Sequence, residues 1–200
     1  WRRHLELCLK STRNPGRIVS ARLSLAANLR HQGRLLEAEM ESRKALSEAL
    51  GYGGKESTRL GQALRNLGKT LQDQGRLAEA EKLARTGIRI YEKSGLSEDS
   101  SQMLEERMFY GDVLVRKEKY PEAREQYDLL REAGKRNPEN FKKTFANPPA
   151  ILTLIKTGAV REALELIPAA YESRARIHGE DDSRTARIVG LRAMAYAANG

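Results

Sequence analysis

The chain has 200 residues, of which 40% are hydrophobic and 32% charged but only 6% aromatic. It is long enough to bury a core, and its prominent Ala, Leu, Arg and Glu residues favour helices over strands. Six prolines are too few for a disordered chain. Because the prominent residues favour helices, we expect an almost wholly helical protein. The net charge of +9 permits acidic partners, and no apolar run approaches the roughly 20 residues of a membrane span.

Residues 1–9 predict the end of a helix that begins before the sequence does. The chain opens at Trp1 without a methionine or a signal-peptide pattern, so we expect a cytoplasmic chain that is an excerpt or has lost a leader. Cys8 is the single cysteine, which rules out an internal disulfide and favours a reducing compartment. We interpret Cys8 as a small buried hydrophobe rather than a reactive thiol.

A repeat of 42 residues dominates the rest of the sequence. The phrase HQGRLLEAE at 31–39 returns as DQGRLAEAE at 73–81, and more weakly as KEKYPEARE at 117–125 and KTGAVREALE at 156–165. We therefore predict one array over residues 1–200, and incomplete repeats at both ends indicate a fragment of a longer protein. Its predicted repeats are 1–16 (partial), 17–53, 54–95, 96–137, 138–179 and 180–200 (partial).

Each repeat predicts two helices that form an antiparallel hairpin. In the second repeat, Leu60, Leu64 and Leu67 recur at three- and four-residue spacing, which places an apolar stripe on the first helix. Gly75 ends that helix, and a second apolar stripe follows it. In the fourth repeat, Pro148 and Pro149 predict a first helix that is short or displaced.

The most glycine-dense run, GYGGKES at 51–57, raises the question of a phosphate-binding loop. The motif fails at both ends, because Glu56 stands where Ser or Thr is needed and Ala49 stands where Gly is needed. Steps of 42 residues from Gly53 reach Gly95, Asn137 and Gly179, and Gly and Asn tolerate the left-handed conformation at helix ends. We therefore interpret this run as a helix end. The residues expected to cap the helices that follow are Ser57 or Thr58, Ser100 or Ser101, and Ser183.

Small residues recur where helices must approach closely, as at Ala26, Gly68 and Gly111 in the first helices and Ala38 and Ala80 early in the second. This pattern resembles the tetratricopeptide repeat over nearly the whole chain. The phrase LRNLGKTLQDQGRLAEAEKLARTGIRIYEKSG at 64–95 looks like the long repeats of kinesin light chains and of bacterial scaffold and sensor proteins. The resemblance implies an all-α solenoid of stacked antiparallel hairpins, wound as a right-handed superhelix.

No arrangement of residues predicts catalysis, a cofactor or a metal site. His4, His31 and His178 lie in different repeats, and none has a second ligand at helical spacing. No Ser, His and Asp arrangement and no Cys and His pairing can be read from the sequence. Carboxylates that recur with the repeat are expected to face solvent at the starts of the second helices: Glu37, Glu39, Glu41, Glu79 and Glu81. We predict a non-enzymatic chain, with an enzymatic domain outside these residues left open.

In the tetratricopeptide family the first helices line a concave groove for extended or helical peptides. Matching the motif by position places ten residues in such a groove: Arg30, His31, Gln62, Arg65, Asn66, Lys69, Gln72, Asp73, Asp112 and Arg116. Asn66 stands where kinesin light chain repeats carry asparagines, and an asparagine can both donate to and accept from a peptide backbone. The basic residues in this set favour an acidic partner.

Three functions stay open at this point. The first is an interaction scaffold that binds a protein, a peptide or a neighbouring domain of its own chain. The second is the sensor or regulatory region of a larger caspase-like protease, kinase or ATP-dependent transcription regulator. Nucleic-acid binding by the arginine-rich first segment ranks lowest, because aromatic side chains that could stack on bases are scarce there. The arginines in question are Arg2, Arg3, Arg13, Arg17 and Arg22.

Overall fold

The structure is a computed structural model that describes Arg3, Glu6 and residues 14–53, 57–136 and 147–199. It divides into two compact units, residues 1–109 (unit 1) and 110–200 (unit 2). Every regular element in the described ranges is a helix, which confirms the predicted all-α class. None of these helices is long and apolar enough to cross a membrane.

Some predictions stay untested. Those for Cys8, for Glu56 in the glycine-dense run and for Asn137 fall outside the described residues. The single array over residues 1–200, its repeat boundaries and its right-handed winding also stay predictions.

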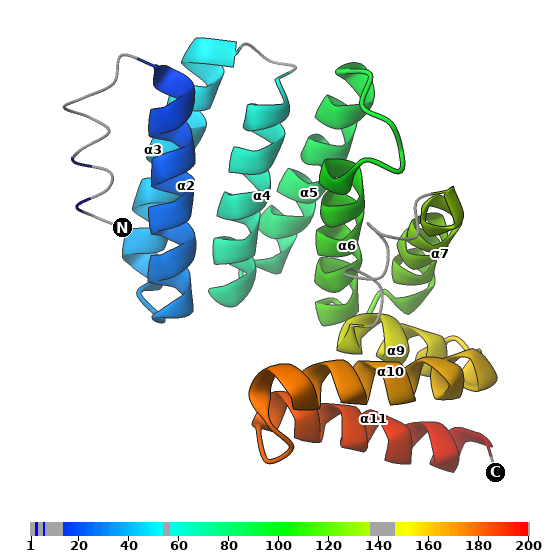
Figure 1. The fold of residues 1–200 in the computed structure, drawn as a ribbon. Coiled ribbons are helices and arrows are strands. Elements are labelled where there is room, and N and C mark those ends of the chain that lie inside the picture. The colour runs from blue at the N-terminus through cyan, green and yellow to red at the C-terminus, as the bar shows by residue number, and fades with distance from the viewer. Residues whose placement is uncertain (1–2, 4–5, 7–13, 54–56, 137–146, 200) are drawn as a thin grey trace. The chain divides into compact units, whose positions relative to one another are not determined.

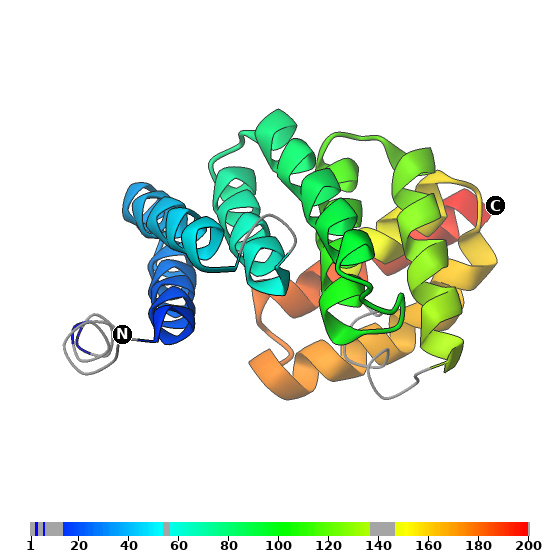
Figure 2. The same cartoon turned by 90° about the horizontal axis from the view of Figure 1, so that it is seen from above.

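Unit 1 contains two antiparallel helical hairpins that lie side by side (Figures 1 and 2). In the first, α2 (Pro15–His31) packs on α3 (Leu35–Gly53), and in the second, α4 (Thr58–Asp73) packs on α5 (Leu77–Lys93). The two hairpins stack on each other: α4 of the second hairpin contacts both α2 and α3 of the first. The next helix, α6 (Ser101–Arg116), lies in unit 1 as far as Phe109.

The turn inside each hairpin contains one residue with a positive φ angle. Gly33 and Gly75 adopt φ values of 74° and 79° in unit 1, and Gly158 adopts 80° in unit 2. The third turn uses Glu118 at φ 58°, a conformation that costs a residue with a side chain about 1–2 kcal/mol. The repeat in sequence therefore predicts the positions of the turns more reliably than the residue that makes them.

Polar side chains cap the starts of several helices. Ser57 accepts a hydrogen bond from the Leu60 amide at 3.2 Å, as predicted, and Ser100 accepts one from the Met103 amide at 3.4 Å. The prediction for Ser183 is wrong, because the carboxylate of Asp182 accepts from the Arg184 amide at 2.8 Å and caps α11 instead. A carboxylate at this position is also favoured by the positive end of the helix dipole.

Glycines inside the helices make room for large side chains of neighbouring helices. A Cβ atom added to Gly68 would lie 2.6 Å from Cζ of Phe109, and one added to Gly61 would overlap the ring of Tyr91. Tyr91 and Phe109 are among the largest fully buried side chains of unit 1. Gly68 therefore makes room for a ring of α6, and the predicted close approach of helices at the small residues stays a prediction.

Unit 2 is built from α7 (Tyr120–Arg136), α9 (Pro148–Lys156), α10 (Val160–His178) and α11 (Ser183–Asn199), together with the end of α6. α9 contacts α7, α10 and α11, and α10 packs along α11. The buried centre of α9, α10 and α11 contains Ile151, Leu154, Ile167, Ile188 and Leu191.

Prolines shape two helices of unit 2. α9 has only nine residues and begins with both prolines, and the side chain of Asn147 caps it by accepting from the Ala150 amide at 2.8 Å. This confirms the predicted short helix. Pro168 lies inside α10, where it has no amide hydrogen to donate to the carbonyl of Leu164.

Candidate functional site

Unit 1 has a surface hollow of about 310 Å³ between α2 and α4. Side chains at helical spacing reach it from each helix, so one face of each helix forms a wall. The described residues that line it are Leu23, Ser24, Ala27, Arg30, Gln62, Arg65, Asn66 and Lys69. Five of the ten residues predicted for a groove are thus brought together here. None of the eight lining residues is acidic.

Two of the cationic side chains in the hollow are held by carboxylates outside it. Nη1 of Arg30 lies 2.9 Å from Oδ2 of Asp73, and Nη2 of Arg65 lies 2.5 Å from Oε2 of Glu105. The Glu105 side chain is 50% exposed, whereas that of Arg65 is only 12% exposed. The guanidinium groups are therefore fixed in place, while their acidic partners remain open to water.

Asn66 connects α4 with the first hairpin. Its side-chain amide donates to the backbone carbonyl of Leu23 at 3.2 Å, and its carbonyl oxygen accepts from the Ser42 hydroxyl at 2.9 Å. The amide thus donates and accepts as the sequence suggested, but both bonds are to residues of the same chain. Asn66 holds the wall of the hollow. The side-chain amide of Gln62, in contrast, forms no hydrogen bond with any residue that the structure describes.

A buried carboxyl group lies behind Arg65. Glu106 is fully buried, and neither of its oxygens has a hydrogen-bond partner within the described ranges. Oε2 of Glu106 is 3.6 Å from Nη1 of Arg65. Burial raises the pKa of Glu106 to about 8, against the attraction of Arg65 and Lys69, so the carboxyl group holds its proton at neutral pH. The hydroxyl of Tyr91, whose pKa burial also raises, likewise lacks a partner.

The other predicted groove residues do not line this hollow. His31 is exposed beside Arg30, Gln72 is buried, and Asp73 serves as the partner of Arg30. Asp112 and Arg116 belong to unit 2, where Asp112 accepts a hydrogen bond from the Tyr127 hydroxyl at 2.8 Å and Arg116 is exposed.

The repeating carboxylates differ from the prediction that all of them face solvent. That prediction is wrong for Glu39 and Glu41, whose side chains are only 14% and 15% exposed, and for Glu81, which is buried. Glu39 pairs with Arg76 of the next hairpin at 2.9 Å. Residues between successive hairpins and residues that face solvent both recur once per repeat. The spacing of a carboxylate in the sequence therefore does not show which of these two environments it occupies.

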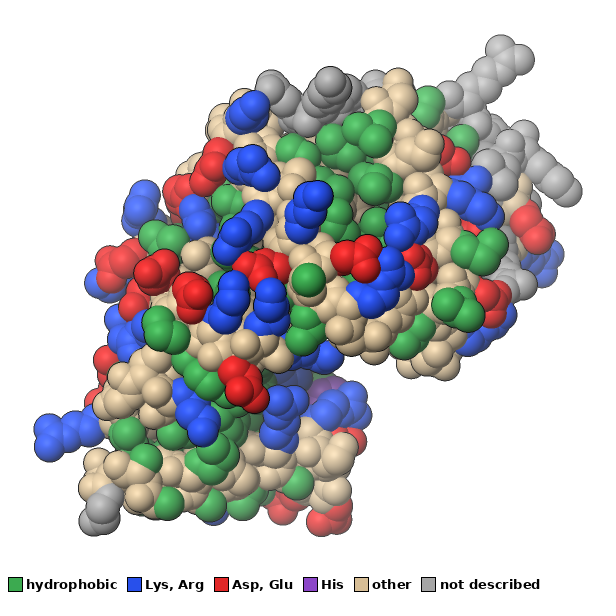
Figure 3. Space-filling view, turned by 180° about the vertical axis from the view of Figure 1, so that it is seen from behind, with side chains coloured by type: hydrophobic (Ala, Val, Ile, Leu, Met, Phe, Trp, Pro, Cys, Tyr) green, Lys and Arg blue, Asp and Glu red, His purple; other side chains and the backbone are tan. Residues whose placement is uncertain are grey.

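Of the first-segment arginines that the structure describes, Arg22 is held by carboxylates. Arg22 pairs with both Glu41 and Glu48 at 2.8 Å, and Arg2 and Arg13 lie outside the described residues. On the face in Figure 3, basic and acidic side chains are interspersed. A nucleic-acid site needs basic side chains clustered on one face.

His, Cys, Asp and Glu side chains form no cluster of three or more that could hold a metal ion in the part of the chain that is described. No group of side chains therefore suggests a metal centre there.

Comparison with known proteins identifies the repeats. Residues 17–93 match the family model described as tetratricopeptide repeat. These residues are tetratricopeptide repeats. The match covers the two hairpins that enclose the hollow, and it confirms the resemblance read from the sequence. No curated protein sequence matches the chain significantly.

Solved structures with the same fold cover the tetratricopeptide repeats and the rest of the chain. The chain is 18% identical, with a TM-score of 0.72, to kinesin light chain TPR-like repeats of Podosopora anserina, and the match covers 94% of this chain and 90% of that one. BtubC from P. vanneervenii is 18% identical with a TM-score of 0.64, over 98% of this chain and 84% of that one. A Rap protein solved with the Competence and Sporulation Factor is 18% identical with a TM-score of 0.61, over 98% of this chain and 58% of that one. At such identities the likeness establishes the fold alone.

Proposed function

We propose that this chain is a protein-interaction scaffold, and that the hollow between α2 and α4 binds an extended acidic segment of a partner or of a neighbouring domain. The observation that carries the proposal is the lining: Arg30, Arg65 and Lys69 line the hollow together with Gln62, and no carboxylate is among the eight lining residues. The Rap protein solved with the Competence and Sporulation Factor supports it, as a protein of similar fold in complex with a partner.

An acidic ligand would exchange with the carboxylates that now hold the guanidinium groups. The carboxylate of Glu105 is 50% exposed, and an ion pair that water reaches in this way contributes only about 0–1 kcal/mol. Replacing Glu105 by a ligand carboxylate therefore costs little, and Arg65 is already oriented. Gln62 can donate to and accept from the ligand backbone, because no described residue occupies its amide.

A labelled synthetic peptide of alternating glutamate and threonine, which favours an extended chain, tests the proposal by fluorescence anisotropy. We expect it to bind, to weaken as salt is added, and to lose at least about tenfold in affinity to the double variant Gln62→Ala and Lys69→Ala. Arg65 and Asn66 are kept, because both contact neighbouring helices and their loss would alter the packing.

Lys82→Ala is the matched control, since Lys82 is an exposed lysine of α5 that does not line the hollow. It removes the same charge and should leave the affinity within about twofold. Equal binding to the wild type and the double variant, or equal binding of a peptide with lysine in place of glutamate, would contradict the proposal.

A further inference from the structure

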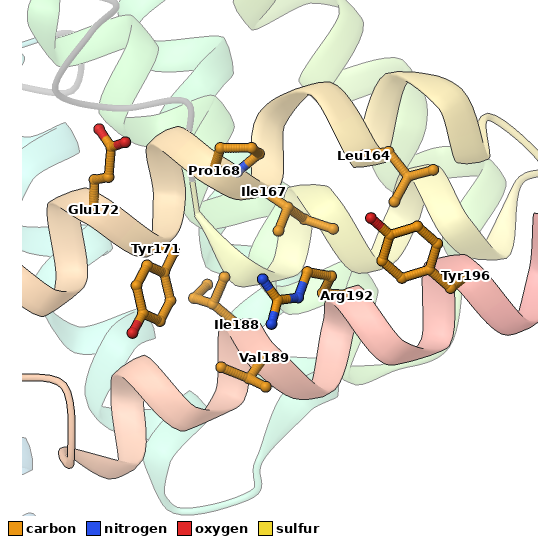
Figure 4. A pocket seen from close by; sticks show the side chains of 9 residues that line it. All are labelled: Leu164, Ile167, Pro168, Tyr171, Glu172, Ile188, Val189, Arg192 and Tyr196. Atoms are coloured by element: carbon orange, nitrogen blue, oxygen red, sulfur yellow. The ribbon is translucent and has the colours of Figure 1, made fainter.

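A second hollow, of about 250 Å³, lies in unit 2 between α10 and α11 (Figure 4). Its walls are mainly apolar: Leu164, Ile167 and Tyr171 come from α10, and Ile188, Val189 and Tyr196 come from α11. Val189 and Tyr196 remain 42% and 62% exposed, although both line the hollow. Apolar side chains are therefore presented to water along the seam of two packed helices.

One cation lies among these apolar groups. Arg192 of α11 lines the hollow, and Figure 4 shows its side chain between Ile188 and Tyr196. No ion pair joins Arg192 to any carboxylate in the described ranges, whereas Arg184 of the same helix pairs with Asp182 at 2.8 Å. Glu172 also lines the hollow, but its carboxylate points away from Arg192.

The size of the hollow indicates what it can hold. Its volume is below the about 300–1,000 Å³ of sites that enclose small molecules. Two antiparallel helices with an apolar seam form the kind of groove in which an amphipathic helix places side chains at positions i, i+3, i+4 and i+7.

Charge selects among helices of this kind. The sequence of α11, SRTARIVGLRAMAYAAN, contains three arginines and no acidic residue. A twofold contact with a second copy that pairs α11 with α11 would bring the arginines of the two helices together, which is unfavourable. A carboxylate beside an apolar stripe complements Arg192 instead.

We propose that the groove between α10 and α11 docks an acidic amphipathic helix of a partner protein, with its apolar side chains against Val189 and Tyr196 and a carboxylate on Arg192. This surface lies in unit 2 and is independent of the hollow between α2 and α4.

Three synthetic helical peptides test this proposal by fluorescence anisotropy with the 200-residue chain. All three peptides carry leucines at positions i, i+3, i+4 and i+7. The flanking residues are glutamate in the first peptide, glutamine in the second and lysine in the third. We expect the glutamate peptide to bind at least about tenfold more tightly than the glutamine peptide and the lysine peptide to bind weakest. Arg192→Ala should remove the preference for glutamate over glutamine.

Two apolar variants test the groove itself. Val189→Asp and Tyr196→Ala should each weaken binding of the glutamate peptide by about tenfold. Both side chains are partly exposed, so circular dichroism should show an unchanged helix content, and Tyr196→Ala suffices if Val189→Asp does not fold. Ile177→Asp is the control, because Ile177 is 62% exposed on α10 outside the hollow.

The double variant Gln62→Ala and Lys69→Ala separates this proposal from the scaffold proposal, since it should leave binding of the helical peptide unchanged. Binding that persists in both apolar variants, or a lysine peptide that binds as well as the glutamate peptide, would overturn the inference. Self-association in sedimentation that Val189→Asp abolishes would also overturn it, by showing that a second copy occupies the groove.

Discussion

At Glu106 a carboxyl group is enclosed by Arg65 at 3.6 Å and by the backbone of Gly87, where an added Cβ would overlap it. Its pKa of about 8 is higher than the ordinary value of 4.5 that it regains on unfolding. Between these two values the folded chain holds a proton that the unfolded chain has lost. Stability is therefore highest below pH 4.5 as far as this group is concerned, and it falls as pH rises towards 8.

Glu106→Gln should remove this pH dependence. We expect urea unfolding to show that the wild type loses stability from acidic to mildly alkaline pH, by up to about 1.4 kcal/mol per pH unit, while the variant loses less. The variant should be the more stable protein at alkaline pH. Glu125→Gln, at an exposed position, is the control and should follow the wild type. Parallel curves for wild type and Glu106→Gln would show that the carboxyl group is ionised in the folded protein.

Gly68 supports a second prediction. The ring of Phe109 occupies the space that a side chain at Gly68 would need. In Gly68→Ala the new methyl group would lie 2.6 Å from that ring, so we expect a loss of about 1–3 kcal/mol in the free energy of unfolding. Gly190→Ala in α11 is the matched control, since no atom beyond its chain neighbours and its own helix backbone lies within 4 Å of the added Cβ. It should stabilise the helix by up to about 1 kcal/mol, and a similar gain for Gly68→Ala would show that the ring can move aside.

Among the elements, α4 depends on Asn66 for its contacts with the first hairpin. Asn66→Ala removes the bond to the Leu23 carbonyl and the bond from Ser42, so we expect a loss of about 1–3 kcal/mol in urea unfolding. Gln62→Ala on the same helix should change stability by less than about 0.5 kcal/mol. If the two variants were equally stable, the hydrogen bonds of Asn66 would be irrelevant to folding and its side chain would be available to a ligand.

The helices were largely predictable because apolar spacing, glycine turns and paired prolines act locally. Pro148 and Pro149 predicted the short α9, since both residues restrict the chain at that position. The orientation of Glu39 and Glu81 was not predictable, because it depends on which neighbouring helix covers them. The left-handed conformation of Glu118 was also not predictable, because a residue with a side chain does not prefer it.

The candidate site was predictable in part. Gln62, Arg65, Asn66 and Lys69 lie together because their spacing places them on one helix face. The pairing of Arg65 with Glu105 and with the buried Glu106 was not predicted, because these partners come from another helix 40 and 41 residues away in sequence. For the groove of unit 2, the sequence offered only the lack of acidic residues in α11, which indicates the charge of the groove but not its place in the fold.

For the whole molecule, the division into two units predicts that a destabilising substitution in one unit leaves the stability of the other largely unchanged. Ile188 is fully buried in the core of α9, α10 and α11, so Ile188→Ala should cost about 2–5 kcal/mol there. Hydrogen exchange followed by mass spectrometry should show faster exchange in these three helices and little change in α2 and α3. Equal acceleration along the whole chain would mean that it unfolds as a single cooperative block.

The fit of Phe109 over Gly68 has a consequence for recombination of such repeats. The glycine lies in α4, and the ring that fills its space comes from α6, beyond the connection that follows α5. A chimera that joins foreign repeats after α5 would inherit the recess without the ring, or place a ring against a position that has no recess. Gly68 and Phe109 therefore have to be exchanged together, so a chimera that folds has to take both residues from the same parent protein.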